Sequence, residues 1–389
     1  MSSDPEGELA ALLPRLIRDS RIHYIDNLRS ALLALVIFHH AALPFGGIGF
    51  WLYISPYHPA GSSRLLSIFV AVNQSYFMGM LFFLAGHFSA ISASRKDWRA
   101  FCLDKLKRLG IPAVVYTLLV QPVAIVLVRW AEHASIWAGL KQYYSGLDGV
   151  RGPAWFIAVL LVFDLVYIFI RKVFSPSSFL IPSSLDRYRL AVAGCILTTI
   201  VTSFLIRLSY PVGRNLPPLG LQLAYASQYV LAYTAGTCLS YIQQYLLVSH
   251  PARALALAYL FAIISLAVIS IPFRLTPSWF AGGANPAALL YAIWNEVFFY
   301  FIGSALYTVF HDWSFTTKRW GNTARYSYGA FLIHPVVIVA LQILVDTGSA
   351  RTIHLHSVLK TVFVGFFGVI LSWAAAWLLL RIPAVGKII

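Results

Sequence analysis

Charged side chains are scarce in this sequence. Only 11% of its 389 residues are Asp, Glu, Lys or Arg, against about 25% in an ordinary soluble domain, whereas 59% are hydrophobic. The mean hydropathy is +0.74. So few charges cannot cover the water-exposed surface of a globular protein of this size, so the composition excludes a soluble domain.

Acidic residues are scarcer than basic ones. The chain has 14 Asp and Glu residues against 29 Lys and Arg, which gives a formal net charge of +15. In a soluble protein such an excess would suggest nucleic-acid binding. In a chain this apolar it is typical of the positive residues that gather in the cytoplasmic loops of membrane proteins, so we expect no nucleic-acid partner.

Several common catalytic and structural motifs are missing. The three cysteines, Cys102, Cys195 and Cys238, form no CxxC pair and give no disulfide framework. The sequence also has no GxxxxGK(S/T) loop, no HExxH pair, no GxSxG turn and no Cys/His cluster. ATP-driven and aqueous hydrolase classes therefore have no support, and we expect no metal site.

Long apolar runs, each bounded by charged residues, Pro or Gly, dominate the sequence. A helix needs about 20 apolar residues to cross the hydrocarbon core of a bilayer. The runs predict an all-α fold, a polytopic transmembrane bundle of about ten helices in one domain at 24–389, preceded by a cytoplasmic or interfacial segment at 1–23. The expected spans are 27–45, 65–91, 109–130, 154–173, 188–208, 219–241, 253–272, 287–310, 326–345 and 356–381.

Lys and Arg are divided unevenly between alternate loops. Twenty of the 29 fall at the two ends of the chain and in the loops on that side, eight fall in the loops on the other side, and Lys360 lies within a span. The positive-inside rule therefore places both termini in the cytoplasm. We expect a multi-pass integral protein of a bacterial inner membrane or of an internal eukaryotic membrane.

Four ionisable residues lie at the start of the first predicted span or within it, where they are costly at membrane depth: Asp26, Arg29, His39 and His40. From Arg29 to His40 is three helical turns plus about 20°, so both lie on one helix face, about 16 Å apart along the axis. Asp26 neighbours Arg29 on that face, whereas His39 points about 80° away. A cation at the cytoplasmic rim and an imidazole deeper in the membrane suit an anionic donor and a general base on one polar tunnel. A buried histidine that hydrogen-bonds to a neighbouring helix explains the same spacing equally well.

The basic loop at 92–108 contains Arg99, Lys105 and Arg108. Lys105 and Arg108 lie three residues apart on one helix face, which suits a clamp for phosphate groups. Ordinary positive-inside charge explains these residues as well.

Further polar residues fall inside the later spans. Glu296, beside Asn295, lies near the middle of the eighth span, and His334 lies at similar depth in the ninth. Asp164 and Lys360 also lie within spans, and nothing in the sequence pairs either with a partner on another helix.

Five short segments occur in a fixed order along the chain. They are Tyr24-Ile-Asp-Asn-Leu-Arg29 through His40, Phe82-Phe-Leu-Ala-Gly86, Lys105-x-x-Arg108-Leu-Gly-Ile-Pro112, Gly152-Pro-Ala-Trp155-Phe, and Tyr326-Ser-Tyr-Gly-Ala-Phe-Leu-Ile-His334-Pro. Together they resemble the acyltransferase-3 family of integral membrane O-acyltransferases. The likeness runs from about residue 22 to 380.

The resemblance implies a ten-helix bundle that moves an acyl group, often acetyl, from acyl-CoA to a hydroxyl. The acceptor is a glycan or a secondary metabolite, and membrane lipid is the surrounding partner. The family's Arg-x(10)-His pattern falls on Arg29 and His40, and its basic pair falls on Lys105 and Arg108. This chain has His39 where an aromatic residue is common, so one histidine can replace the other as the base. The expected roles are catalytic for His40, Arg29, Glu296 and Asp26, acyl-CoA binding for Arg29, Lys105, Arg108 and Arg99, and acceptor binding for His39, Trp155, Asn295 and His334.

Two functions of different classes follow from these residues. In the first, His40 takes the proton of the acceptor hydroxyl, and Glu296 orients or charge-balances His40. In the second, the chain is a proton-coupled secondary transporter whose Glu, His and Lys residues relay protons. Such transporters often contain paired, Gly/Pro-broken spans in related halves, and this sequence shows no such symmetry.

Overall fold

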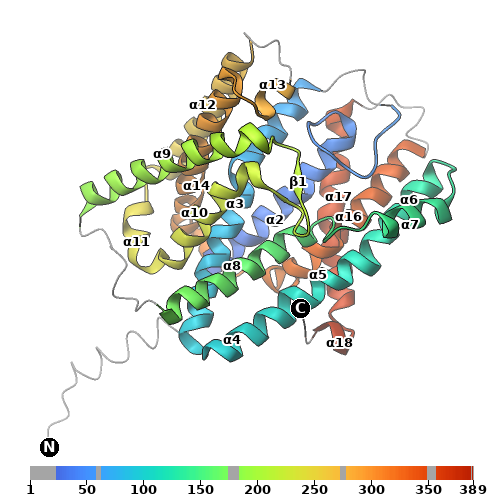
Figure 1. The fold of residues 1–389 in the computed structure, drawn as a ribbon, viewed down its shortest axis with the longest axis horizontal. Coiled ribbons are helices and arrows are strands. Elements are labelled where there is room, and N and C mark those ends of the chain that lie inside the picture. The colour runs from blue at the N-terminus through green and yellow to red at the C-terminus, as the bar shows by residue number, and fades with distance from the viewer. Residues whose placement is uncertain are drawn as a thin grey trace, which may run out of the picture.

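The computed structural model describes residues 23–57, 63–173, 184–271, 277–347, 356–386 and 388. Within these ranges nine helical segments are long and apolar enough to cross a membrane (Figure 1). They are α2 (His23–Ala42) with η1 (Leu43–Phe45), α3 (Arg64–Arg95), the compound segment Trp98–Ala131, α8 (Ala154–Val173), α9 (Leu185–Ser209), α12 (Pro251–Ser270), α14 (Pro286–Asp312), α16 (Thr323–Thr347) and α17 (Ser357–Leu379). The chain is therefore an all-α, multi-pass membrane protein, as predicted, and the segment 1–22 lies outside the described residues.

The sixth expected span, 219–241, is a broken helix. Its first residues belong to a small antiparallel hairpin of β1 (Asn215–Leu216) and β2 (Leu221–Gln222). The helical part consists of η5 (Leu223–Tyr225), α10 (Ala226–Thr237) and α11 (Leu239–Leu246), and the break falls at Cys238. Neither α10 nor α11 alone is long enough to cross a bilayer, which is why nine continuous spans are found in the described residues where ten were expected.

The third span begins earlier than the predicted 109, at Trp98. The Asp97 carboxylate accepts from the backbone N–H groups of Arg99 and Ala100 and so caps the helix there. The segment comprises α4 (Trp98–Lys105), η2 (Leu106–Gly110), α5 (Ile111–Val115), η3 (Tyr116–Val120) and α6 (Gln121–Ala131), and η2 and η3 are π-helical. Each π-turn precedes a proline, Pro112 or Pro122, because a proline lacks the N–H that a regular α-turn requires. Much of the predicted basic loop is therefore helix.

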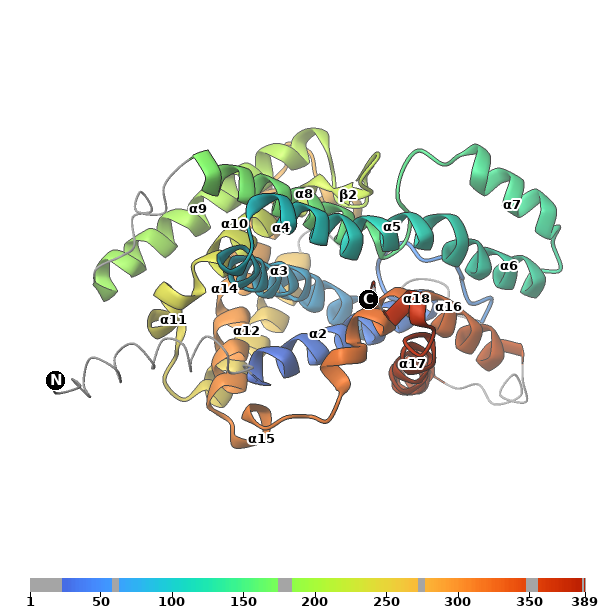
Figure 2. The same ribbon diagram turned by 90° about the horizontal axis from the view of Figure 1, so that it is seen from below.

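Helix α2 lies at the centre of the bundle, between α3 and α14 on one side and α16 and α17 on the other (Figure 2). Short helices complete the described chain: α7 (Ile136–Ser145), α13 (Pro277–Ala281), α15 (Ser314–Thr317) and α18 (Pro383–Gly386). Because α2 has neighbours on every side, its polar residues must find partners on several different helices.

Helices α3 and α10 pack with their backbones in contact. A Cβ atom at Gly86 would collide with the carbonyl oxygen of Tyr233, and one at Gly236 would collide with that of Phe83. Small residues permit this close approach between membrane helices. Gly86, in the second of the five segments, is thus a packing residue.

Candidate active site

Two parallel helices, α2 and α16, form the wall on which the site is built. Arg29 Nη2 donates to the Ala324 carbonyl oxygen at 3.1 Å, across a sequence separation of 295. Three turns further on, Nδ1 of His40 lies 3.0 Å from Nε2 of His334, across a separation of 294. The nearly equal separations show that the two helices run side by side in register. Arg29 and His40 therefore do share the face of α2 that meets α16.

The hydrogen bonds of His334 define how His40 is protonated. Nδ1 of His334 lies 2.5 Å from the Phe331 carbonyl oxygen, which only accepts, so this nitrogen carries the proton. In a neutral His334 the other nitrogen, Nε2, is then an acceptor, and the proton between the two rings belongs to Nδ1 of His40. Nε2 of a neutral His40 is left with a lone pair, and within the described ranges the only hydrogen bond of the His40 ring is the one at Nδ1.

Trp51 and Gln342 hold the His40 ring in place. The indole stacks on the imidazole at 4.7 Å between ring centroids, with 18° between the planes. Its Nε1 donates to Gln342 Oε1 at 2.8 Å, and Gln342 Nε2 donates to the His40 carbonyl oxygen at 3.3 Å. The hydrogen-bonded His334 ring lies nearly coplanar with His40, with 5.2 Å between the ring centroids and 11° between the planes. These contacts restrict the ring, as an orienting shell does for a catalytic base.

The loop that carries Trp51 is tied to a buried ion pair. Lys360 Nζ contacts Asp346 Oδ1 at 2.7 Å, and Tyr53 donates its hydroxyl to Asp346 Oδ2 at 2.9 Å. Burial and the neighbouring Asp346 carboxylate raise the pKa of Tyr53 above its usual value. The phenol therefore stays protonated and remains a donor over the ordinary pH range. Lys360, which the sequence left without a partner, thus pairs with Asp346.

His39 occupies a different environment from His40. It is buried against α3, where its ring stacks on Phe77 at 4.8 Å, and its Nδ1 has no hydrogen-bond partner in the described ranges. The two neighbouring histidines are therefore not equivalent, because only His40 has a partner that orients it.

Arg29 lies at the other end of the shared wall. Its Nη2 contacts Asp26 Oδ1 at 3.2 Å, and its guanidinium lies 5.2 Å from the centroid of the Phe88 ring. On the same face of α2, between Arg29 and His40, Leu33 is 5% exposed and Val36 is 1% exposed. Packed apolar side chains fill this interval, so among the described residues the expected polar tunnel is closed.

The basic residues of 92–108 do not form the expected pair. Lys105 Nζ lies 2.8 Å from Asp164 Oδ2 on α8 and donates to Ser89 at 2.9 Å, so its ammonium is held inside the bundle. Arg108 is 64% exposed and pairs with Asp104 at 3.1 Å, and Arg99 is exposed. The π-turn η2 begins just after Lys105 and rotates Arg108 away from it.

A second polar cluster surrounds Glu296 on α14. Asn295 donates to Glu296 Oε1 at 3.1 Å, and Gln228 on α10 donates to Glu296 Oε2 at 3.3 Å. The proposed pairing of Glu296 with His40 is not made by the described residues, because His40 faces α16 and Glu296 faces α10. Glu296 and His40 were paired because they lie at similar depth, but depth does not say toward which neighbouring helix a side chain points.

Arg207, on α9, is a member of this cluster that sequence reasoning missed. It is fully buried, its Nε donates to the Ala224 carbonyl oxygen at 3.3 Å, and its guanidinium lies 5.3 Å from the Tyr225 ring and 5.1 Å from the Tyr291 ring. Within the described ranges, Nη1 and Nη2 have no hydrogen-bond partner. Arg207 is one of the eight basic residues counted in the loops of the second side, yet it falls in the last turn of the predicted span 188–208, where a buried cation is a functional signal.

Aromatic side chains lie between the two polar clusters. The Trp155 ring is 5.8 Å from Tyr229 and 6.1 Å from Phe156, and Phe156 is 5.6 Å from Phe331 beside His334. Trp155 follows Gly152, whose positive φ and close contact with Gln121 leave no room for a Cβ. Trp155 and His334, both expected to bind the acceptor, are thus joined by two phenylalanines.

Comparison with known proteins identifies the family of the chain. A family model described as an acyltransferase domain matches residues 22–377, most of the chain. The Glucans biosynthesis protein C of Escherichia coli is 28% identical over 156 residues, which are 39% of this chain and 39% of that protein. No solved structure matches. The chain belongs to the acyltransferase-3 family and is a multi-pass membrane acyltransferase.

Proposed function

We propose that the protein transfers an acyl group, in the simplest case acetyl, from acyl-CoA to a hydroxyl of a glycan or a secondary metabolite, with His40 as the general base. One observation carries this proposal: the His334 contact leaves the lone pair of His40 on Nε2, ready to take a proton. A histidine that only fills the core, such as His39, has no partner of this kind.

The donor is proposed to enter from the amino ends of α2 and α16, with both termini in the cytoplasm. Arg29 contacts the first turn of α16, and the hydroxyl of Tyr328, one turn later, donates to the Arg108 carbonyl oxygen at 2.7 Å. Arg29 and Arg108 thus flank this end of α16 and suit the phosphates of CoA. The thioester reaches His40, about 16 Å deeper, when α2 and α16 separate at Leu33 and Val36. Pro335 interrupts the backbone hydrogen bonds of α16 beside His334 and makes such bending easier.

The proposed step balances without a metal or a covalent enzyme intermediate. The acceptor oxygen attacks the thioester carbonyl carbon while its proton passes to Nε2 of His40. The C–S bond breaks as the ester forms, and the proton then moves from Nε2 to the departing thiolate. His334 stabilises the imidazolium because its Nε2 accepts the hydrogen bond that Nδ1–H of His40 donates, the role that a carboxylate plays in a catalytic triad.

The acceptor is proposed to lie along the aromatic residues toward the Arg207 cluster. Two donor groups of Arg207 and the acceptor oxygens Gln228 Oε1 and Asn295 Oδ1 have no partner among the described residues. Sugar hydroxyls both donate and accept, so a polyol satisfies such a mixed set. The name of the glucan-related protein that the chain resembles makes glucan oligosaccharides the first acceptors to test.

The test uses purified protein in detergent, isotope-labelled acetyl-CoA and a panel of glucan oligosaccharides, with mass spectrometry of the ester. We expect wild-type protein and His39→Gln to form the ester and His40→Gln to lose it. Activity that survives in His40→Gln and disappears in His39→Gln would reject the assignment. Because detergent solution holds no gradient, ester formation there also distinguishes the enzyme from a proton-coupled transporter.

A further inference from the structure

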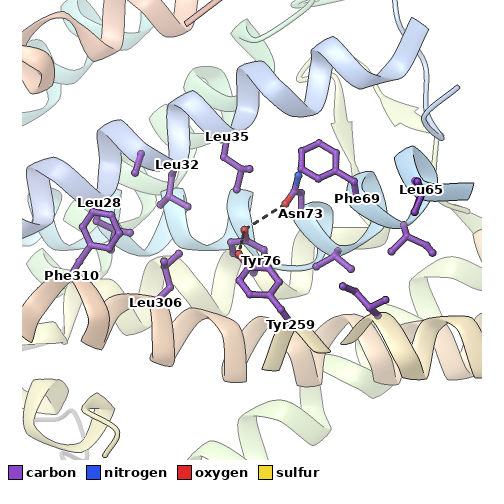
Figure 3. Close-up of a pocket in the computed structure, with 14 residues that line it drawn as sticks. Leu28, Leu32, Leu35, Leu65, Phe69, Asn73, Tyr76, Tyr259, Leu306 and Phe310 are labelled. Carbon is purple, nitrogen blue, oxygen red and sulfur yellow. Dashed lines mark hydrogen bonds between the residues drawn. The ribbon is translucent and has the colours of Figure 1, made fainter. Parts of the chain in front are cut away.

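A groove of about 580 Å³ opens between α2, α3, α12 and α14 (Figure 3). It lies on the opposite side of α2 from the site, since Ala31 and Leu35 are about 180° and 140° around the helix from His40. Its lining is almost entirely apolar, and none of the described residues that line it is charged. The groove is therefore unsuited to CoA or to a free sugar.

Among the described residues that line the groove, polar side chains are found at one place. The hydroxyls of Tyr259 and Tyr76 lie 2.6 Å apart, and Tyr76 donates to Asn73 Oδ1 at 3.5 Å (Figure 3). This chain of bonds runs from Tyr259 to Tyr76 to Asn73 and ends at the amide oxygen. Asn73 is 3% exposed, and its Nδ2 has no partner among the described residues. Asn73 lines the groove, and its Nδ2 is a buried N–H donor whose missing acceptor an occupant of the groove can supply.

The depth of Asn73 indicates which acceptor would reach it. Helix α3 has 32 residues and is about 48 Å long, against about 30 Å for the hydrocarbon core, so a centred α3 extends about 9 Å beyond it at each end. Asn73 is nine residues from the start of α3, or about 14 Å, which places it about 5 Å inside the hydrocarbon boundary. The ester carbonyls of glycerophospholipids border the hydrocarbon core, so they are the lipid acceptors nearest to Asn73.

The rim of the groove is apolar and exposed. Leu65 is 66% exposed and Ile263 is 41% exposed, on helices that cross the membrane. We propose that the groove binds one acyl chain of a membrane glycerophospholipid, with Asn73 Nδ2 donating to its ester carbonyl. The volume falls within the usual range for a small-ligand site, and its lining matches a hydrocarbon chain.

Photo-crosslinking of the full chain in phospholipid vesicles tests this assignment. The probes are two phospholipids with a mid-chain diazirine, one ester-linked and one ether-linked, and adducts are mapped by peptide mass spectrometry. We expect the ester probe to label 28–35 of α2 and 65–76 of α3 about fivefold more than the ether probe, as loss of one hydrogen bond predicts. Asn73→Leu should remove that preference, and Ala31→Trp should suppress groove labelling by both probes.

Leu197→Trp, on the exposed face of α9, is the matched control and should leave groove labelling unchanged. Equal labelling by ester and ether probes in wild-type protein would overturn the role of Asn73 without any substitution. Labelling that persists in Ala31→Trp would show that lipid contacts the rim only. Neither readout depends on acyl transfer, so failure here and failure of the enzymatic assignment are distinguishable.

Discussion

The two polar clusters of the bundle differ in how completely their hydrogen bonds are satisfied. Around His40, the histidine pair, Trp51 and Gln342 bond to one another, and the ring of His40 is held by Trp51 on one face and by His334 at its Nδ1 edge. Around Arg207, two guanidinium nitrogens and two amide oxygens have no partner among the described residues. Each cluster lies inside a membrane bundle, where an unsatisfied polar group is expensive.

This difference separates a site for chemistry from a site for a ligand. A general base must be held in one orientation before the reaction, so His40 is bonded at Nδ1 and stacked on Trp51 while Nε2 stays open for the acceptor proton. A binding site keeps unused donors and acceptors because the ligand supplies their partners. The predictions below test this division, from the largest expected effect to the smallest.

Replacing the base should have the largest effect. We expect His40→Gln to reduce kcat about 10³-fold, because general-base catalysis contributes about 10² to 10⁴. His39→Gln, at the neighbouring position without an orienting partner, should change kcat by less than about threefold, since its imidazole takes no part in proton transfer. Initial rates with labelled acetyl-CoA measure both, and comparable losses in the two variants would remove the distinction between them.

Substitution of Lys105 tests whether this buried cation stabilises the fold or binds acyl-CoA. Lys105→Met should destabilise the protein by about 3–5 kcal/mol, because Asp164 would be left as a buried, uncompensated charge. The double variant Lys105→Met/Asp164→Leu should recover most of that stability and keep the wild-type KM for acyl-CoA. Thermal unfolding in detergent measures the first effect. If the stable double variant has a higher KM for acyl-CoA than the wild-type protein, Lys105 binds the phosphates of CoA after all.

Arg207 should behave in the opposite way. We expect Arg207→Met to lower kcat/KM for the acceptor about 10²-fold, as two charge-assisted hydrogen bonds predict, with no change in the KM for acyl-CoA. The melting temperature should fall less than in Lys105→Met, because Glu296 keeps the hydrogen bonds that Asn295 and Gln228 donate to it. Arg214→Met, an exposed cation near the same end of α9, is the control. A lower melting temperature with unchanged acceptor kinetics would make Arg207 a structural residue.

Tyr53 should show the smallest effect. Tyr53→Phe removes the hydrogen bond to Asp346 and loosens the loop that holds Trp51 over His40, at a cost of about 1 kcal/mol. We expect kcat to fall about threefold. The ratio of wild-type to variant kcat should be the same from pH 6 to pH 9, because the raised pKa of Tyr53 keeps the phenol of the wild-type protein protonated throughout. A ratio of the two rates that changes with pH would contradict this role.

The sequence by itself determined the membrane class, most of the spans and the placement of Arg29 and His40 on one helix face. These are properties of composition and of periodicity along one helix, so they need no knowledge of neighbours. The broken sixth span escaped prediction because Cys238 interrupts a helix whose hydropathy is continuous.

Only the tertiary structure decided which groups meet. It paired His40 with His334 rather than with Glu296, Lys105 with Asp164, and Lys360 with Asp346, and it placed Arg207 inside the bundle. Partners across helices depend on the rotation and register of each helix against its neighbours. Packing over the whole bundle sets that register, and no single segment of sequence encodes it.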